Sequence, residues 1–251
     1  MLIDAHTHMR FGDETEFKLL LRKNLIISLL CASSVAQYHR FANHLRSEMN
    51  QGRVFLSFGI HPWEATNALT ADQIELLHQA TVIGEIGMDT VWCQTPLQLQ
   101  RTVFLQQLEI AHSLNKPIIL HSKGRENEIA AILKEFMHSS TGPKVAVHWY
   151  SGPEDTLERL IEMGCYFTLA PDVTSNPVQM QVARNVPLNR LLTESDGVEG
   201  VSWALGKEAE ISDIPFFLES IIQKTAELRS LDKTRLKKTV YENFMRFVTY
   251  E

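Results

Sequence analysis

The amino-acid sequence predicts an α/β protein folded as a single (β/α)8 barrel, or TIM barrel. Short runs rich in Val, Ile and Leu recur eight times along the 251 residues, and longer amphipathic segments separate them. The runs are apolar almost throughout, which is typical of parallel strands covered on both faces. Eight strand–helix units in about 250 residues match the usual size of this barrel.

The eight predicted strands follow one another at intervals of roughly 20 to 35 residues. In chain order they contain "LIDAH", "LIISLLCA", "VFLSFGIH", "TVIGEIG", "KPIILHS", "KVAVHWY", "CYFTLAP" and "RLLTESDG". Several of the segments between them begin with Ser, Thr, Asp or Pro, as helix starts do. The predicted helices are residues 14–23, 33–48, 70–79, 96–114, 126–138, 153–164, 176–186, 214–228 and 232–248.

A doubly wound open sheet is the alternative architecture. That fold usually carries a glycine-rich phosphate loop after its first strand, and "LIDAH" is followed by "THMRFGDE" instead. Nothing in the composition marks a linker, so residues 1–251 are expected to form one domain.

Composition narrows the classes of protein that this chain can represent. A net charge of −6 argues against the broad positive field of proteins that grip long duplex nucleic acid, so an anionic substrate would be held locally. Three widely spaced cysteines fit reduced thiols better than a disulfide framework. No apolar run approaches the roughly 18 residues of a membrane span, and no signal-peptide pattern opens the chain. We therefore expect a cytoplasmic protein without membrane contact.

Histidines and carboxylates gather at the C-terminal ends of the predicted strands, where TIM barrels carry their active sites. The pair in "DAHTH" is separated by one residue, so both side chains point the same way from a strand. A lone histidine at a strand end is usually structural, but five of the ten histidines lie at such ends. The gathered residues are His6, His8, His61, Glu85, His121, His148 and Asp196.

Imidazole and carboxylate groups are the ligands of Zn, Mn or Fe, and carboxylates with water extend the range to Mg. Even without His61, the set holds four histidines and two carboxylates, which are too many for one catalytic ion that keeps an open position. They suit two divalent ions about 3.5 to 4 Å apart, bridged by a carboxylate and a water molecule.

Six segments in order carry a resemblance to a known family: "DAHTH", "GIHPW", "GEIGMD", "PIILHSK", "HWYSG" and "TESDG". With the closing "ENFMRF", they resemble the TatD family of metal-dependent deoxyribonucleases, in the amidohydrolase superfamily, from end to end. The resemblance implies a (β/α)8 barrel with a two-metal centre (Mg, Mn or Zn). It also implies that DNA is cleaved at phosphodiester bonds, from strand ends and in the manner of a 3'-5' exonuclease.

The resemblance also implies a role for each candidate ligand. His6 and His8 would hold one ion, and His121 and His148 the other. Glu85 would bridge both ions, and Asp196 would bind an ion while acting as general base. Many relatives in the superfamily use a carbamylated lysine as the bridge, so Glu85 favours the nuclease branch.

Two departures from the family pattern bear on the substrate. Relatives usually follow the fifth-strand histidine with Ser-Arg, whereas this chain places Lys123 there and Arg125 two residues later. We expect both to help neutralise a phosphate, although lysine cannot form the fork that arginine does. After the eighth strand, an arginine-rich loop is usual, and here the loop is the acidic "DGVEGVSWALGKEAE".

His61 would either contact the phosphate of the substrate or support a metal ligand.

All four tryptophans follow predicted strands on the rim that carries the histidines. Single-stranded nucleic acid stacks on aromatic side chains. We expect one or two of the tryptophans, with Trp149 and Trp203 as candidates, to stack on bases, unless they only pack loops together.

Two other functions stay open. A hydrolase of the same fold could act on a small ester, an amide or an aminoacyl ester, because the same metal chemistry attacks carbonyl carbon. Alternatively, the barrel could serve as a component of a larger multi-protein assembly.

Overall fold

The structure is a computed structural model that describes residues 1–23, 25–136 and 142–249. Eight parallel strands form one sheet in the order β1 to β8, which confirms the predicted barrel. Almost all strand residues are buried on both faces. The strands are β1 (Leu2–Thr7), β2 (Ile26–Ala32), β3 (Val54–Phe58), β4 (Val82–Asp89), β5 (Ile118–Lys123), β6 (Val145–Val147), β7 (Tyr166–Leu169) and β8 (Leu191–Thr193).

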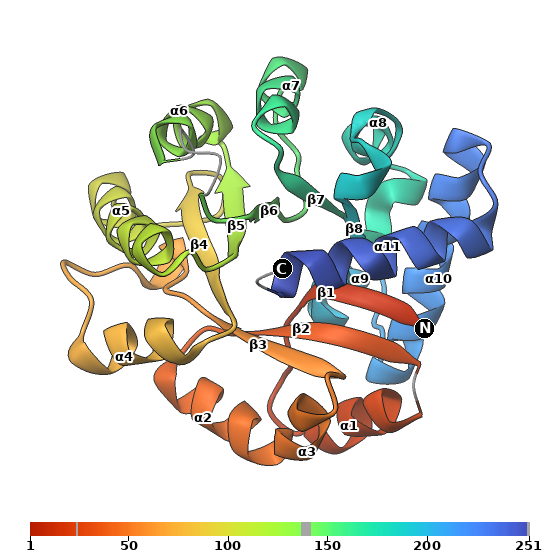
Figure 1. Ribbon diagram of the computed structural model, residues 1–251, viewed down its shortest axis with the longest axis horizontal. Coiled ribbons are helices and arrows are strands. Elements are labelled where there is room, and N and C mark those ends of the chain that lie inside the picture. The colour runs from red at the N-terminus through yellow and green to blue at the C-terminus, as the bar shows by residue number, and fades with distance from the viewer. Residues whose placement is uncertain (24, 137–141, 250–251) are drawn as a thin grey trace.

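Helices surround the strands (Figure 1). They are α1 (Glu14–Arg22), α2 (Val35–His44), α3 (Arg46–Asn50), α4 (Ala71–Gln79), α5 (Leu97–Leu114), α6 (Glu126–Phe136), α7 (Glu154–Glu162), α8 (Pro177–Asn185), α9 (Gly197–Leu205), α10 (Ile214–Arg229) and α11 (Lys233–Val248). Short 3-10 helices are η1 (Pro62–Glu64), η2 (Pro171–Thr174), η3 (Leu188–Arg190) and η4 (Ile211–Asp213). The last two residues of the predicted helix 126–138 lie outside the described residues. None of the helices in the described ranges is long and apolar enough to cross a membrane.

The structure corrects two of the predicted elements. Residues 33–48 were expected to form one helix, but the chain turns at Leu45 and continues as α3. The acidic segment after β8 was expected to be a loop, and its first part is the helix α9. Val198 and Val201 of α9 are buried, and the helix packs against α10 and η2. These apolar contacts stabilise a helix in a segment that the family pattern predicted to be a loop.

The barrel closes where β8 meets β1. The hydroxyl of Thr193 donates a hydrogen bond to the carbonyl of Ile3 at 2.6 Å, and the amide of Asp196 donates to the carbonyl of His6 at 3.1 Å. The amide of Ser195 donates to Oδ1 of Asp4 at 2.8 Å. Helix α11 packs against both strands and crosses in front of them in Figure 1. The closure brings the C-terminal ends of β1 and β8 side by side.

Candidate metal centre

The six predicted metal ligands converge at the C-terminal end of the barrel, each positioned by a strand or by the residues just after it. His6 lies in β1, and His8 follows that strand. Glu85 lies in β4 and His121 in β5. His148 and Asp196 follow β6 and β8. Ligand atoms within 4.8 Å of one another form three groups: His6, His148 and Asp196; His6, His8 and Glu85; and His61, Glu85 and His121.

The carboxylate of Glu85 lies between two pairs of histidines. Its Oε1 is 2.6 Å from Nδ1 of His121 and 2.8 Å from Nε2 of His148. Its Oε2 is 3.3 Å from Nε2 of His8 and 3.6 Å from Nε2 of His6. One oxygen therefore faces each pair, which is the arrangement of a carboxylate that bridges two cations.

Asp196 completes the half of the site that contains His6 and His8. Its Oδ1 lies 3.1 Å from Nε2 of His6 and 3.6 Å from Nε2 of His8. Its backbone is left-handed, with φ of 55°, and Gly197 follows with φ of 74°. A Cβ at residue 197 would lie 2.5 Å from the carbonyl oxygen of His8, so glycine is needed where the chain turns out of β8.

The second nitrogens of His121 and His6 are held by neighbouring side chains. Nε2 of His121 is 3.1 Å from Oδ2 of Asp89. Nδ1 of His6 is 3.1 Å from the thiol sulfur of Cys31, to which the hydroxyl of Ser57 donates at 2.9 Å. Such partners fix the orientation and the tautomer of a metal-binding imidazole. Sequence reasoning did not single out Asp89 or Cys31, although Asp89 ends the "GEIGMD" segment.

Electrostatics keep both carboxylates of the site ionised. Burial alone would raise the pKa of Glu85, but the charges of His148 and His61 hold it well below its usual value. Burial likewise opposes ionisation of Asp196, and the neighbouring His6 lowers its pKa to about 2.

Burial lowers the pKa of His61. The charges of Glu85 and Glu194 act against burial at His148 and raise its pKa well above its usual value. Because imidazoles bind divalent cations in the neutral form, a cation that binds His148 would displace its proton.

The residues fit two cations because ring nitrogens that can bind a metal ion face one another around Glu85. Nε2 of His6 is buried and has no hydrogen-bond partner among the described residues. Nδ1 of His121 faces Nε2 of His61 and Nε2 of His148, each at 3.3 Å. A divalent cation on each side of Glu85 would give these ring nitrogens a common positive partner.

Residues 3–249 match the profile of the family described as "TatD related DNase". This chain belongs to that family. Among its relatives, the uncharacterized metal-dependent hydrolase YcfH of Escherichia coli K12 is 26% identical over 98% of this chain and 94% of its own length. The chain is thus a metal-dependent hydrolase of the TatD type, which confirms the resemblance read from the six segments.

Two animal relatives and one solved structure resemble this TatD-family chain. The zebrafish "putative deoxyribonuclease tatdn3" is 26% identical over 97% of this chain and 96% of its own. The human "3'-5' RNA nuclease TATDN2" is 26% identical over 77% of this chain and 28% of its own. The crystal structure of YjjV, a TatD homologue from E. coli K12, superposes with a TM-score of 0.80 at 22% identity. It covers 98% of this chain and 97% of its own.

Of the remaining predicted site residues in this TatD-type barrel, His61 lies at the centre, and Lys123 interacts with the charges of Asp196 and Glu85. His61 caps η1 rather than ending β3, and its Nε2 is 3.6 Å from Oε1 of Glu85. Lys123 ends β5, and its ammonium group donates to the carbonyl of Trp149 at 2.7 Å and to the hydroxyl of Ser151 at 3.0 Å. Burial lowers its pKa.

The side chain of Arg125 faces α6. Its guanidinium faces Glu128 at 3.9 Å, and its side chain is 41% exposed. The structure therefore places one of the two predicted phosphate-binding cations against the centre and the other beside α6.

The two candidate tryptophans of this TatD-type site form an edge-to-face pair with ring centroids 5.3 Å apart. Trp149 is buried, at 7% exposure, whereas Trp203 of α9 is 63% exposed. Trp203 is thus the ring of the pair that is open to solvent, and Trp149 supports it from beneath.

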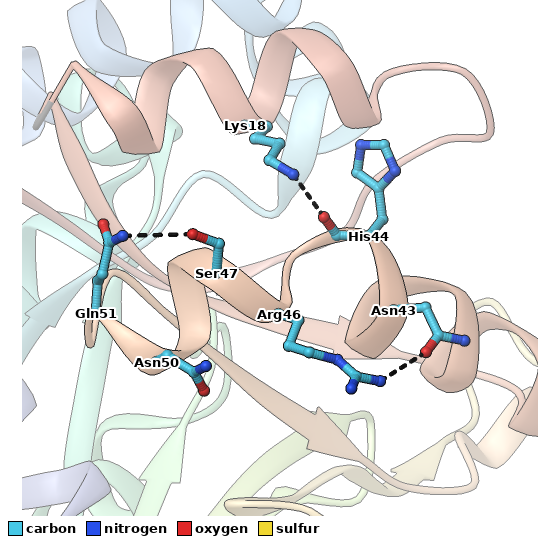
Figure 2. A pocket seen from close by; sticks show the side chains of 7 residues that line it. All are labelled: Lys18, Asn43, His44, Arg46, Ser47, Asn50 and Gln51. Carbon is cyan, nitrogen blue, oxygen red and sulfur yellow. Dashed lines mark hydrogen bonds between the residues drawn. The ribbon is translucent and has the colours of Figure 1, made fainter.

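A hollow of about 550 Å³ lies away from this centre, between α1 and the α2–α3 corner (Figure 2). Helix α3 leads to the N-terminal end of β3, opposite the end that carries the metal ligands. Lys18 donates to the carbonyl of His44 at 2.8 Å, and Arg46 donates to Oδ1 of Asn43 at 3.2 Å. These cations are engaged in holding the helices together, so we assign no chemistry to this hollow.

Proposed function

We propose that this chain hydrolyses phosphodiester bonds of DNA, starting from strand ends and proceeding in the 3'-5' direction. The position of Glu85 carries the proposal, because each of its oxygens faces a different histidine pair. A carboxylate between two cation sites is typical of two-metal hydrolysis of phosphate esters.

Each half of the proposed centre has its own ligands. His6, His8 and Asp196 would hold one cation with Oε2 of Glu85. His121 and His148 would hold the other with Oε1 of Glu85. Two Mg, Mn or Zn ions bound there would lower the pKa of a water molecule and neutralise charge that develops on the phosphate.

Asp196 is the residue best placed to remove the proton of the attacking water. With a pKa of about 2 it is ionised at neutral pH, and its side chain is 23% exposed at the edge of the site. As Asp196 accepts that proton, the water oxygen bonds to phosphorus and the bond from phosphorus to the departing sugar oxygen breaks. The departing oxygen takes up a proton from solvent and leaves as a hydroxyl group. A general base of this kind contributes about 10² to 10⁴ in rate.

The residues around the centre suit an anionic strand. Lys123 provides positive charge beside the ligands, and His61 can donate to a phosphate oxygen if it does not bind metal. Arg125 stands beside α6, where it can meet a phosphate along the strand. The exposed ring of Trp203, supported by Trp149, offers a face on which a base can stack.

The names of two relatives support a nucleic-acid substrate. The zebrafish relative is named a putative deoxyribonuclease and the human relative a 3'-5' RNA nuclease. DNA and RNA must therefore be compared directly for this chain.

The decisive experiment is a hydrolysis panel on the purified protein. Single- and double-stranded DNA and RNA, labelled at either end, are compared with a small carboxylic ester, with and without chelator. We expect single nucleotides to leave the 3' end of DNA, with loss of activity in chelator and recovery when Mg, Mn or Zn is added. Hydrolysis of the carboxylic ester alone, or no hydrolysis after metal is restored, would overturn the proposal.

A further inference from the structure

A hollow of about 520 Å³ opens beside His8, on the rim of the barrel. The segments that follow β1 and β2 form two of its walls, and Glu199 of α9 forms part of a third. His8 belongs both to this lining and to the proposed metal centre. A ligand in this hollow would therefore lie next to the proposed metal centre, where the phosphodiester bond would be cleaved.

Two arginines line the hollow. Nε of Arg10 donates to Oδ2 of Asp13 at 3.4 Å, and the Arg10 side chain is 48% exposed. Nε of Arg40 is 3.1 Å from Oε1 of Glu14. A guanidinium has five N–H donors, so a contact through Nε leaves donors with which an anion can bond in a fork.

Phe11 is the most exposed large apolar side chain of the described chain, at 85%. The guanidinium carbon of Arg40 lies 4.9 Å from the Phe11 ring centroid and 5.3 Å from that of the buried Phe41. Arg40 thus supports Phe11 from one side. A flat aromatic face at the mouth of a cationic hollow matches a nucleotide, which carries a base next to a phosphate.

The N-terminus of α2 adds little positive charge to the hollow, because backbone amides there donate to side chains of the same segment. The hydroxyl of Ser34 accepts from the amide of Gln37, and the Gln37 side chain accepts from the amide of Ser33. The arginines therefore supply the attraction for an anion. Glu199 opposes it, since its carboxylate lies 4.0 Å from Nε of Arg10.

We propose that this hollow binds the nucleotide adjoining the scissile phosphodiester, with its phosphate at Arg10 and Arg40 and its base on Phe11. The proposal rests on the proposed function, because it requires a nucleic-acid strand in the metal centre. The hollow then adds a positioning site that a substrate with one phosphate and no bases does not use.

The test compares two substrates on the metal-loaded protein. Bis(4-nitrophenyl) phosphate has a single phosphate and reports on the centre without the phosphate contact at Arg10 and Arg40, and a short single-stranded DNA oligonucleotide reports on the centre and the hollow. We expect Arg10→Gln to raise KM for the oligonucleotide about tenfold, the loss of one charge-assisted hydrogen bond. Removing one phosphate contact should also reduce the slope of log KM against log salt by about 0.7.

Two further variants test the contribution of the aromatic ring and of the opposing carboxylate separately. Phe11→Ala should raise KM about fivefold or more for the oligonucleotide, and make no difference when the adjoining nucleotide is abasic. Glu199→Gln should act in the opposite direction and lower KM. Arg46→Gln, in the distant hollow, and Phe216→Ala, 69% exposed on α10, are the matched controls and should leave KM unchanged.

The outcomes distinguish this proposal from the proposed function. Oligonucleotide cleavage that Arg10→Gln, Phe11→Ala and Glu199→Gln leave unchanged would overturn the nucleotide site alone. Equal losses with both substrates would also overturn it, because the variants would then act on the centre or the fold. A wild-type protein that hydrolyses bis(4-nitrophenyl) phosphate but no oligonucleotide would overturn both proposals.

Discussion

At the scale of single residues, the two carboxylates of the proposed centre, Glu85 and Asp196, differ in their surroundings and in their proposed roles. Glu85 is 6% exposed and surrounded by imidazoles, so it has no room to accept a proton from a substrate water. Asp196 is at the edge of the site, with its Oδ1 within 3.6 Å of His6 and His8. This geometry supports the proposed roles of Glu85 as the bridging carboxylate and of Asp196 as the general base.

Asp196→Asn should retain the fold and reduce turnover by about 10² to 10⁴, because the amide cannot accept a proton. Turnover on single-stranded DNA and the melting temperature measure the two effects. Asp72→Asn, on the exposed face of α4, is the control and should change neither. Turnover within tenfold of wild type in the Asp196 variant would place the base elsewhere.

Asp89→Asn should lower the affinity for one metal ion about 10- to 100-fold. Asp89 accepts hydrogen bonds from the amides of Val91 and Trp92 through Oδ1 and faces Nε2 of His121 through Oδ2. In the variant, the amides would keep the remaining oxygen and the new NH2 group would face His121. That exchange favours the tautomer protonated on Nδ1, the nitrogen that faces Glu85.

Calorimetric titration of the metal-free protein measures the affinity. Asp155→Asn is the control, because Asp155 is 72% exposed on α7. Unchanged affinity for both ions in the Asp89 variant would show that Asp89 does not set the tautomer of His121.

At the scale of elements, the pairing of β4 with β5 positions the Glu85 bridge against His121. Gly87 pairs with His121 in this ladder, two residues beyond Glu85. A Cβ at residue 87 would lie 1.8 Å from the carbonyl oxygen of His121. Only glycine lets the strands approach this closely.

Gly87→Ala should therefore destabilise the protein by about 3 kcal/mol or more, because backbone must move in a packed sheet. Gly52→Ala is the matched control. A Cβ there meets nothing within 4 Å, and its φ of 65° should cost only about 1 to 2 kcal/mol. Urea denaturation compares the two variants, and equal losses of stability would contradict the argument from close approach.

The strands and most helices could be predicted because buried parallel strands are apolar throughout and amphipathic helices have clear starts. Helix α9 could not, because its stability comes from contacts of Val198 and Val201 with elements distant in sequence. The candidate ligands could be found from strand ends and the family resemblance. Cys31 could not, since nothing local marks a thiol in a buried strand as the partner of His6.

At the scale of the whole molecule, the join between β8 and β1 connects barrel closure to the site. Asp4 holds this join through hydrogen bonds from the amide of Ser195 at 2.8 Å and from its hydroxyl at 2.7 Å. The next residue along the chain is Asp196. Burial raises the pKa of Asp4 to about 7, so closing the barrel costs free energy whenever this carboxyl is ionised.

The pKa of Asp4 makes the stability of the fold depend on pH in a definite direction. Below pH 4 the carboxyl is protonated in both states. As pH rises from about 4 to 7, the unfolded chain loses this proton and the folded chain keeps it, so the contribution of Asp4 to stability falls. The pKa of Asp4 is about 7 in the folded state and 3.8 for the ordinary carboxyl group. This difference corresponds to about 4 kcal/mol of stability at low pH, and the contribution is fully lost above pH 7.

Asp4→Asn should remove this dependence, because an amide does not titrate in this range. The free energy of unfolding of the variant relative to wild type should rise between pH 4 and 7 and level off above 7. Urea denaturation of the metal-free variant and wild type across that range measures this difference. Glu85 and Asp196 have lowered pKa values and act in the opposite direction, but they are present in both proteins, so their contributions cancel. A difference that stays constant with pH would show that Asp4 is already ionised in the closed barrel.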